Sequence, residues 1–300
     1  MTKDYLAIDV GGTRLKVGLI DRSGNIIEKF SERTNTAGLE AFLGQLRDVI
    51  GRYDGKIRGV GFSLPGKLAH PDDTIKGGGS LTFMDGVNLR DKLALDIPIA
   101  VENDGKAAAL AELWLGQLKD VQDGMAIVLG TGVGGGLVLN GNLVYGTHFQ
   151  AGELSFIFNQ LEKGMDTSIG LNGSAVEMIK RIGTELKLPE IDDGLAVFEY
   201  INAGNPVAVD IFDAYAAEIA LLIQNIQAIV DVQRIVIGGG ISAQPIVAER
   251  IRDQYMTFFE GNEVVAGTLT PVEIVAGQFA NDANLFGVIY HLLMELNQEV

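Results

Sequence analysis

The stretch VENDGKAAAL, residues 101–110, places an asparagine and an aspartate between the apolar end of an expected strand and an alanine-rich helix start. A carboxylate at such a junction has two possible uses. It can cap the helix, because aspartate is a preferred N-cap residue, or it can face a substrate and accept a proton from an attacking hydroxyl group. The junction alone leaves both roles open for Asp104, so the surrounding elements have to be considered.

Two glycine-rich turns are candidates for holding phosphate groups. The first, GGT at 11–13, follows the strand YLAIDV and precedes a hairpin that turns at 22–25. The second, GTGVGGG at 130–136, follows the strand GMAIVL and precedes another hairpin, whose Asn140 and Gly141 suit a type I′ turn. Such turns present backbone N–H groups without obstructing side chains, and two of them could hold a triphosphate. The alternative is that the glycines only shape the hairpins.

Polar residues beside the first turn fit the same chemistry. Asp9 ends the first strand, where its carboxylate would interact with Mg²⁺ through water. Thr13 and Lys16 would add a hydroxyl group and a cation for the phosphate tail. The alternative for Asp9 is a turn cap.

Three glycine motifs, one of them the second turn itself, match the patterns of other nucleotide-binding classes only in part. GFSLPGKL at 61–68 nearly satisfies the P-loop pattern, but Leu68 replaces its hydroxyl residue and Pro65 removes an amide. GTGVGG at 130–135 matches the dinucleotide fingerprint, but a strand follows where that motif needs a helix N-terminus. GGGISA at 238–243 lies between a strand and a helix and fits better, although a tight strand-to-helix turn explains it equally well.

The repeated order of strand, glycine turn and hairpin predicts two duplicated domains, each continued by α/β material. We expect domain boundaries that assign 1–116 and 283–300 to the first domain and 117–282 to the second. The last expected helix, 282–296, then folds back onto the first domain. The other expected helices span 38–52, 104–116, 174–187, 206–230 and 245–259, and IRGVGFSL and RIVIGGG are expected strands.

Composition limits the partners. The 300 residues include 23 Lys and Arg against 39 Asp and Glu, a net charge of −16, which disfavours a nucleic-acid surface. Cysteine is absent, which excludes disulfides and thiolate metal sites. Neither a leader peptide nor a run of apolar residues long enough to span a bilayer is evident. We therefore expect a cytoplasmic protein with no nucleic-acid or membrane partner.

Taken together, the motifs at 9–13, 102–104, 130–136 and 238–242 resemble the ROK family (repressor, open reading frame, kinase) of the actin-like, ribonuclease-H-like ATPase superfamily. The similarity covers nearly the whole chain in order and spacing. The resemblance implies an α/β fold of two duplicated actin-like domains flanking a cleft. It also implies an ATP- and Mg²⁺-dependent homodimeric kinase that phosphorylates a hexose or β-glucoside, at the 6-hydroxyl group.

The resemblance further assigns roles to residues of this chain. Asp104 would be the general base, and Asn103 would bind sugar hydroxyl groups. Gly66, Ser80 and Glu153 are the other expected substrate contacts. The expected ATP-binding residues are Asp9, Gly11, Gly12, Thr13, Lys16, Gly130, Thr131, Gly132, Gly134, Gly135, Gly238, Gly239 and Gly240.

The sequence departs from the family pattern after the second hairpin. Many members carry Gly-Glu-(Ile/Leu)-Gly-His and then a cysteine-rich zinc motif, whereas AGELSFIF here has Phe156 in place of the histidine. We therefore expect no zinc, and we interpret His148 as a surface or loop histidine. Either Phe156 and Phe158 hold this loop by packing, or an aromatic ring here accepts the aglycone of a glycoside.

Three other functions are alternatives to the sugar kinase. A transcriptional repressor of the same family would need a helix-turn-helix before the first strand, which starts by residue 5. An NAD-dependent oxidoreductase rests only on the glycine motifs above. The remaining alternative is a catalytically weak sugar-binding sensor or regulator of the same family.

Overall fold

The protein is described by a computed structural model at residues 4–69, 72–159 and 167–298. The chain forms two compact units. The first consists of Met1–Lys119, Leu143–Ala151 and Asp282–Val300, and the second of Asp120–Asn142 and Gly152–Asn281. The chain therefore passes between the units four times. The segment Leu143–Ala151, expected in the second domain, groups with the first unit.

The first unit is built on a five-stranded sheet in the order β3-β2-β1-β4-β7. Strands β1 (Asp4–Val10), β2 (Arg14–Ile20) and β3 (Ile26–Arg33) form antiparallel hairpins, whereas β4 (Ile57–Leu64) and β7 (Ile99–Asn103) continue the sheet in parallel. β1 and β4 are buried along almost their whole length, because helices cover both faces of the sheet.

The second unit repeats this topology in the order β10-β9-β8-β11-β12. Its hairpins join β8 (Gly124–Leu129), β9 (Val133–Leu139) and β10 (Asn142–Val144), and β11 (Arg234–Gly238) and β12 (Glu273–Ala276) run parallel to β8. Asn140 and Gly141 have φ values of 52° and 73°, as the predicted type I′ turn requires. The predicted duplication of a mixed α/β domain of the actin-like ATPase type is confirmed.

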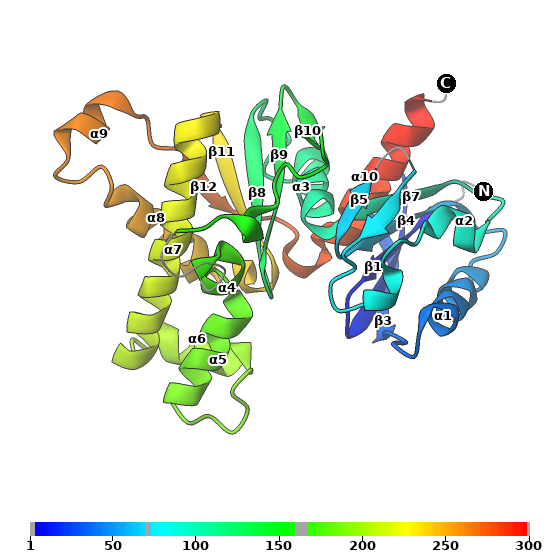
Figure 1. Ribbon diagram of the computed structural model, residues 1–300, viewed down its shortest axis with the longest axis horizontal. Helices are drawn as coiled ribbons and strands as arrows, with labels where there is room; N and C mark the ends of the chain where they lie inside the picture. The colour runs from blue at the N-terminus through cyan, green and yellow to red at the C-terminus, as the bar shows by residue number, and fades with distance from the viewer. Residues whose placement is uncertain (1–3, 70–71, 160–166, 299–300) are drawn as a thin grey trace. The chain divides into compact units, whose positions relative to one another are not determined.

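Helices cover the two faces of the first sheet differently. α1 (Leu39–Gly51) packs against Leu6 and Ile8 on one face, and α3 (Asp104–Leu115) and α10 (Ala283–Gln298) lie on the other, where Ala7 is buried (Figure 1). α10 packs very closely on β4. A Cβ atom at Gly61 of β4 would come within 2.7 Å of the Val288 carbonyl oxygen of α10. The expected return of the last helix to the first unit is confirmed.

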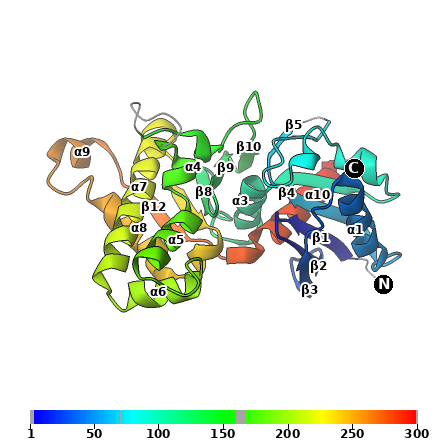
Figure 2. The same cartoon turned by 60° about the horizontal axis from the view of Figure 1, so that its bottom comes forward.

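The second sheet is covered largely by helices α5 (Ala175–Glu185), α6 (Gly194–Asn202), α7 (Pro206–Val230) and α8 (Pro245–Met256). α5, α6 and α7 lie together in both views (Figures 1 and 2). α6 was not predicted from the sequence, although Asp193 caps it through the N–H groups of Leu195 and Ala196. The shorter elements are α2 (Leu89–Leu93), α4 (Ile169–Asn172), α9 (Glu263–Thr268), β5 (Lys67–Ala69) and β6 (Thr74–Lys76). Within the described ranges, no helix has the length and apolar character needed to cross a bilayer.

Candidate active site

Four polar side chains form a row across the first sheet. Strand register pairs Lys16 with Asp9, Asp9 with Ser63, and Ser63 with Glu102. Residues paired across neighbouring strands project to the same face of the sheet. The row lies at the carboxyl ends of the parallel strands β1, β4 and β7, the edge at which open α/β sheets bind ligands.

Asp9 is held at this edge by two partners. Its Oδ1 accepts a hydrogen bond of 2.9 Å from the Nδ2 of Asn284 on α10, and its Oδ2 lies 3.4 Å from the Nζ of Lys16. The residue is only 8% exposed. The Asp9 carboxylate therefore binds Lys16 of β2 and Asn284 of α10. The alternative, that Asp9 caps the turn, is wrong.

The first glycine turn lies between β1 and β2. It is closed by the Gly11 N–H donating to the Arg14 carbonyl at 3.0 Å, and Thr34 Oγ1 donates to the Gly11 carbonyl at 2.6 Å. A Cβ atom at Gly12 would lie 1.9 Å from Ser80 Oγ. Ser80, expected to contact sugar, therefore lies directly against the first glycine turn.

Asn103 and Asp104 end β7 and begin α3. Asn103 is the N-cap residue, since its side chain accepts the Lys106 N–H at 3.2 Å, while its Nδ2 donates to the Gly66 carbonyl at 2.9 Å. Asp104 is the first helical residue, and its Oδ1 accepts from the Gly105 N–H at 2.7 Å and from Asn103 Nδ2 at 3.0 Å. Asp104 is exposed, whereas every other residue of 99–112 is buried. The carboxylate thus lies at the surface of the first unit on a rigid junction.

The second glycine turn is shorter than the sequence suggested. The Gly130 N–H donates to the Gly132 carbonyl at 3.0 Å, and Ser155 Oγ accepts the Val133 N–H at 3.0 Å beside it. Gly134 and Gly135 are not in the turn but in β9, paired with β8. A Cβ atom at Gly135 would lie 2.8 Å from a Leu154 methyl group, so this glycine is needed for packing.

A pocket of about 700 Å³ opens at this turn, entirely within the second unit. A volume of this size is typical of small-molecule sites. Gly130 and Gly240 line it, as does Asn281, whose side chain contacts the Gly240 position. The remaining lining residues are Leu129, Ala175, Val176, Ile179, Glu190, Asp192, Asp193, Gly194, Leu195, Phe198, Ile241 and Gln244. Among the residues that the structure describes, the lining therefore contains three carboxylates and no lysine, arginine or histidine.

The third glycine motif contributes to this pocket but lacks the dinucleotide geometry. β11 ends at Gly238, and a short 3₁₀ turn, Gly240–Ala243, intervenes before α8. Gly239 has φ of 90°, and a Cβ atom there would lie 2.1 Å from the Leu129 carbonyl oxygen. At this motif the backbone passes very close to the end of β8. The motif does not lead directly into a helix N-terminus, as the dinucleotide fingerprint requires.

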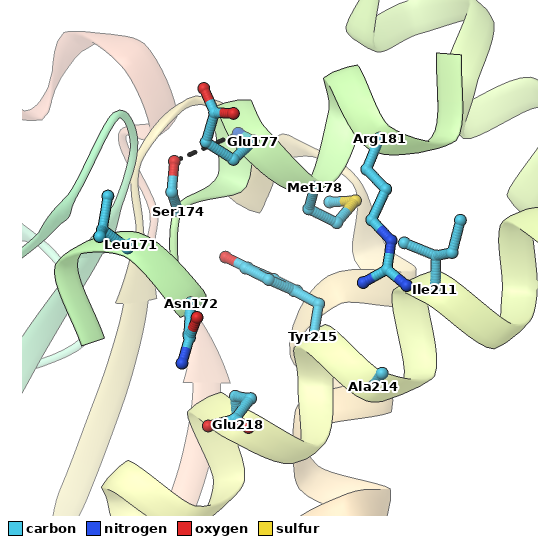
Figure 3. A pocket seen from close by; sticks show the side chains of 10 residues that line it. All are labelled: Leu171, Asn172, Ser174, Glu177, Met178, Arg181, Ile211, Ala214, Tyr215 and Glu218. Atoms are coloured by element: carbon cyan, nitrogen blue, oxygen red, sulfur yellow. Dashed lines mark hydrogen bonds between the residues drawn. The ribbon is translucent and has the colours of Figure 1, made fainter. Parts of the chain in front are cut away.

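A second pocket lies between α4, α5 and α7 of the same unit, with a volume of about 290 Å³ (Figure 3). Its lining includes Arg181, Glu177 and Glu218, but no glycine turn. The buried Tyr215 hydroxyl group at its base has no hydrogen-bond partner among the described residues. Because no glycine turn of the described residues lines it, this pocket is a poorer match for a nucleotide than the larger one.

The segment that departs from the family pattern follows β10. Phe156 is 64% exposed and Phe158 is 45% exposed, so the interpretation that these rings hold the loop by packing is wrong. His148 is exposed in a loop of the first unit, as expected, and Glu153 belongs to the second unit. In the described part of the chain, no group of three or more His, Asp or Glu side chains is placed to hold a metal ion.

Several site residues were not found from the sequence. Thr34, Ser155 and Asn284 support the two turns and Asp9 from distant positions, and Gln244 and Asn281 line the larger pocket. No motif marks these residues, because their roles come from contacts between segments that are far apart in the chain.

Comparison with known proteins agrees with this geometry. The ROK family model matches residues 5–294. A β-glucoside kinase of Listeria innocua is 30% identical over 97% of this chain and 98% of its own length. A glucokinase of Halalkalibacterium halodurans is 30% identical over 79% of this chain and 80% of its own length. A ROK family protein from Streptococcus pneumoniae, solved in complex with sucrose, superposes with a TM-score of 0.86 at 26% identity, covering 98% and 99% of the two chains. The chain therefore belongs to the ROK family and is one of its ATP-dependent sugar kinases.

Proposed function

We propose that this sugar kinase transfers the γ-phosphate of ATP to the 6-hydroxyl group of a hexose or β-glucoside, with Asp104 as general base. The observation that carries the assignment is that Asn103 and Asp104 have different roles at the start of α3. Asn103 supplies the helix cap, so the exposed Asp104 carboxylate is not needed for capping. Gly66, Asn103 and Glu153 are the proposed sugar contacts.

The chemistry suits a fixed carboxylate. A sugar hydroxyl group is a poor nucleophile, and a positioned carboxylate can orient it and accept its proton as phosphoryl transfer proceeds. Two donors hold Asp104 Oδ1, the Gly105 N–H and Asn103 Nδ2, which fixes the plane of the carboxylate. Much of the rate acceleration in such enzymes comes from positioning of this kind.

We assign the nucleoside part of ATP to the larger pocket of the second unit. Its described lining carries Glu190, Asp192 and Asp193 and no cationic side chain, so it would repel a polyphosphate but can accept hydrogen bonds from ribose or base. The phosphates are then left to the backbone N–H groups of the turns at 11–13 and 130–132.

Asp9 is the proposed Mg²⁺ contact. Mg²⁺ usually keeps several waters and is held by one or two carboxylates together with substrate phosphates, so a single carboxylate at the sheet edge fits it. When bound, the ion would neutralise charge on the transferring phosphate. Lys16, 3.4 Å from Asp9 Oδ2, provides a second positive charge at the same edge.

The acceptor is proposed to be a β-glucoside in preference to a free hexose. Phe156 stands where many family members have a histidine, and its ring is mostly exposed, which gives an aglycone an aromatic surface to stack on. The β-glucoside kinase of Listeria innocua is similar to this chain over 97% of the length of this chain. The homodimer and the cytoplasmic location implied by the family resemblance are part of this proposal.

The deciding experiment measures ADP release with ATP and Mg²⁺ against glucose, mannose, fructose, N-acetylmannosamine and cellobiose. We expect sugar-dependent turnover in the wild type and its loss, by a factor of about 10² to 10⁴, in Asp104→Asn. Asp96→Asn, another exposed aspartate of the first unit, is the matched control and should keep full activity.

The remaining outcomes are also informative. Tight sugar binding without turnover would identify a sensor and overturn the kinase mechanism. Turnover of free glucose equal to or better than that of cellobiose would refute the preference for β-glucosides while leaving Asp104 as the base.

A further inference from the structure

We propose that Glu102 is a positioning residue for Asn103 and Asp104, and that Tyr145 and His291 hold it from two other segments of the chain. This inference rests on the proposed function, because it concerns how the candidate base is kept in place. It assigns a role to the C-terminal helix α10 and to the segment Leu143–Ala151, neither of which contains a recognised motif.

Glu102 is a fully buried carboxylate next to the candidate base. Its exposed fraction is 0%, and its Oε1 accepts the backbone N–H of Asn103 at 2.7 Å. Removing a carboxylate from water is costly unless charges or hydrogen bonds compensate for it. A buried charge at this position therefore needs partners, and those partners fix where the peptide between residues 102 and 103 lies.

Tyr145 supplies the shortest contact. Its hydroxyl group donates to Glu102 Oε2 at 2.6 Å, a length typical of a strong hydrogen bond from a hydroxyl to a charged oxygen. Burial, and then the negative charge of Glu102, raise the pKa of Tyr145 above its usual value, so the hydroxyl remains a donor at physiological pH. Tyr145 lies in Leu143–Ala151, which groups with the first unit although the chain on either side belongs to the second.

His291 approaches the same oxygen from α10. Its Nδ1 lies 3.4 Å from Glu102 Oε2, and its Nε2 lies 3.5 Å from Glu295 Oε1 one helical turn further on. Glu295 is itself bound by Arg90 at 2.8 Å. Glu295 therefore orients the imidazole ring of His291, and the Nδ1 of that ring faces Glu102.

α10 supports the row of polar residues at two points. Asn284, which donates to Asp9, and His291 are seven residues apart, so they lie on the same face of the helix two turns from each other. Between them, Val288 packs on Gly61 of β4 at a spacing that leaves no room for a larger residue. This close packing fixes the distance between α10 and the sheet, and it therefore fixes the positions of the Asn284 and His291 side chains.

The experiment uses single variants of the full-length enzyme in the ADP-release assay. Tyr145→Phe removes only the hydroxyl group, and His291→Gln places an amide nitrogen near the Nε2 position while losing the Nδ1 contact. Tyr145→Phe removes one hydrogen bond and His291→Gln removes one electrostatic contact to Glu102, so we expect each to lower kcat about 2- to 10-fold. The KM for ATP should stay within about twofold and the melting temperature within a few degrees, because the nucleoside pocket belongs to the second unit.

Two comparisons separate positioning from general damage. His291→Asn keeps a nitrogen near the Nδ1 position and should retain more of kcat than His291→Gln. Tyr215→Phe, at a buried tyrosine without a hydrogen-bond partner in the described residues, should leave kcat unchanged. In the double variant of Tyr145→Phe and His291→Gln, the loss should be smaller than the product of the two single losses, since both act through Glu102.

The proposal fails if Tyr145→Phe keeps the wild-type kcat, if His291→Asn and His291→Gln lose equally, or if the losses of the double variant multiply. Should the His291 variants not fold, Tyr145→Phe alone decides, because it keeps the ring. An active Asp104→Asn enzyme would instead refute the proposed function, so the two failures can be told apart.

Discussion

The side-chain oxygen of Asn103 accepts the backbone N–H of Lys106 at 3.2 Å, and this contact makes Asn103 the cap of helix α3. The adjacent Asp104 is exposed at the first helical position, where its Oδ1 accepts hydrogen bonds from the Gly105 N–H and the Asn103 amide. Helix capping and the proposed catalytic role of Asp104 can therefore be separated by substitution.

We expect Asn103→Ser and Asn103→Ala to separate these two effects. Serine is also a good N-cap, so only the alanine variant should lose about 1 kcal/mol of unfolding free energy in urea titrations. Both variants lose the amide that donates to the Gly66 carbonyl and to Asp104. Both should therefore lose about tenfold or more in kcat/KM for the sugar. A serine variant with wild-type kcat/KM would show that the amide has no part in the reaction.

Gly12→Ala should disturb the first glycine turn, the proposed phosphate site, through a clash with Ser80. The new Cβ atom would lie 1.9 Å from Ser80 Oγ and 2.9 Å from Ser80 Cβ. We expect a clear rise in the KM for ATP, partial recovery with Ser80→Ala and fuller recovery with Ser80→Gly, because these changes remove the clashing atoms in turn. Steady-state kinetics of the single and double variants measures this order. If Ser80→Gly gives no recovery, the clash is not the cause.

Ribose recognition can be tested at the acidic side of the larger pocket. The Glu190 and Asp192 side chains are exposed there and make no hydrogen bond in the described part of the chain, whereas Asp193 is occupied in capping α6. We expect the wild type to prefer ATP over dATP. Glu190→Gln combined with Asp192→Asn should reduce this preference by about 5- to 10-fold.

The matched control for the ribose test is Asp193→Asn, which keeps a good N-cap residue and should leave the ratio of kcat/KM values for ATP and dATP unchanged. An unchanged ratio in the Glu190 and Asp192 double variant would place the ribose hydroxyl groups elsewhere.

Alkaline stability should depend on Tyr215, whose pKa is raised by burial. Above pH of about 10 the unfolded chain loses this phenolic proton while the folded protein keeps it, so the unfolding free energy falls as pH rises. Tyr215→Phe should remove about 1.4 kcal/mol per pH unit from that slope. Urea unfolding between pH of about 9 and 11 measures it, and an unchanged slope would mean that the hydroxyl group ionises in the folded state.

Much of the fold could be predicted from the sequence because its signals are local. The two glycine turns, the strands before them and the Asn140–Gly141 hairpin each depend on backbone preferences that a few neighbouring residues express. The repetition of this order predicted the duplicated sheets. α6 was missed because its apolar residues were not recognised as helix-periodic behind Asp193, which caps it.

The details of the site were decided by tertiary structure. The sequence by itself placed Asp9, Asn103 and Asp104 at strand ends, but it could not say which of the last two caps α3, because both residue types cap helices well. Asn284 reaches Asp9 across 275 positions and Tyr145 reaches Glu102 across 43. Local preferences carry no information about such pairs; they form only when α10 and Leu143–Ala151 pack against the first sheet and bring buried charges within hydrogen-bonding distance.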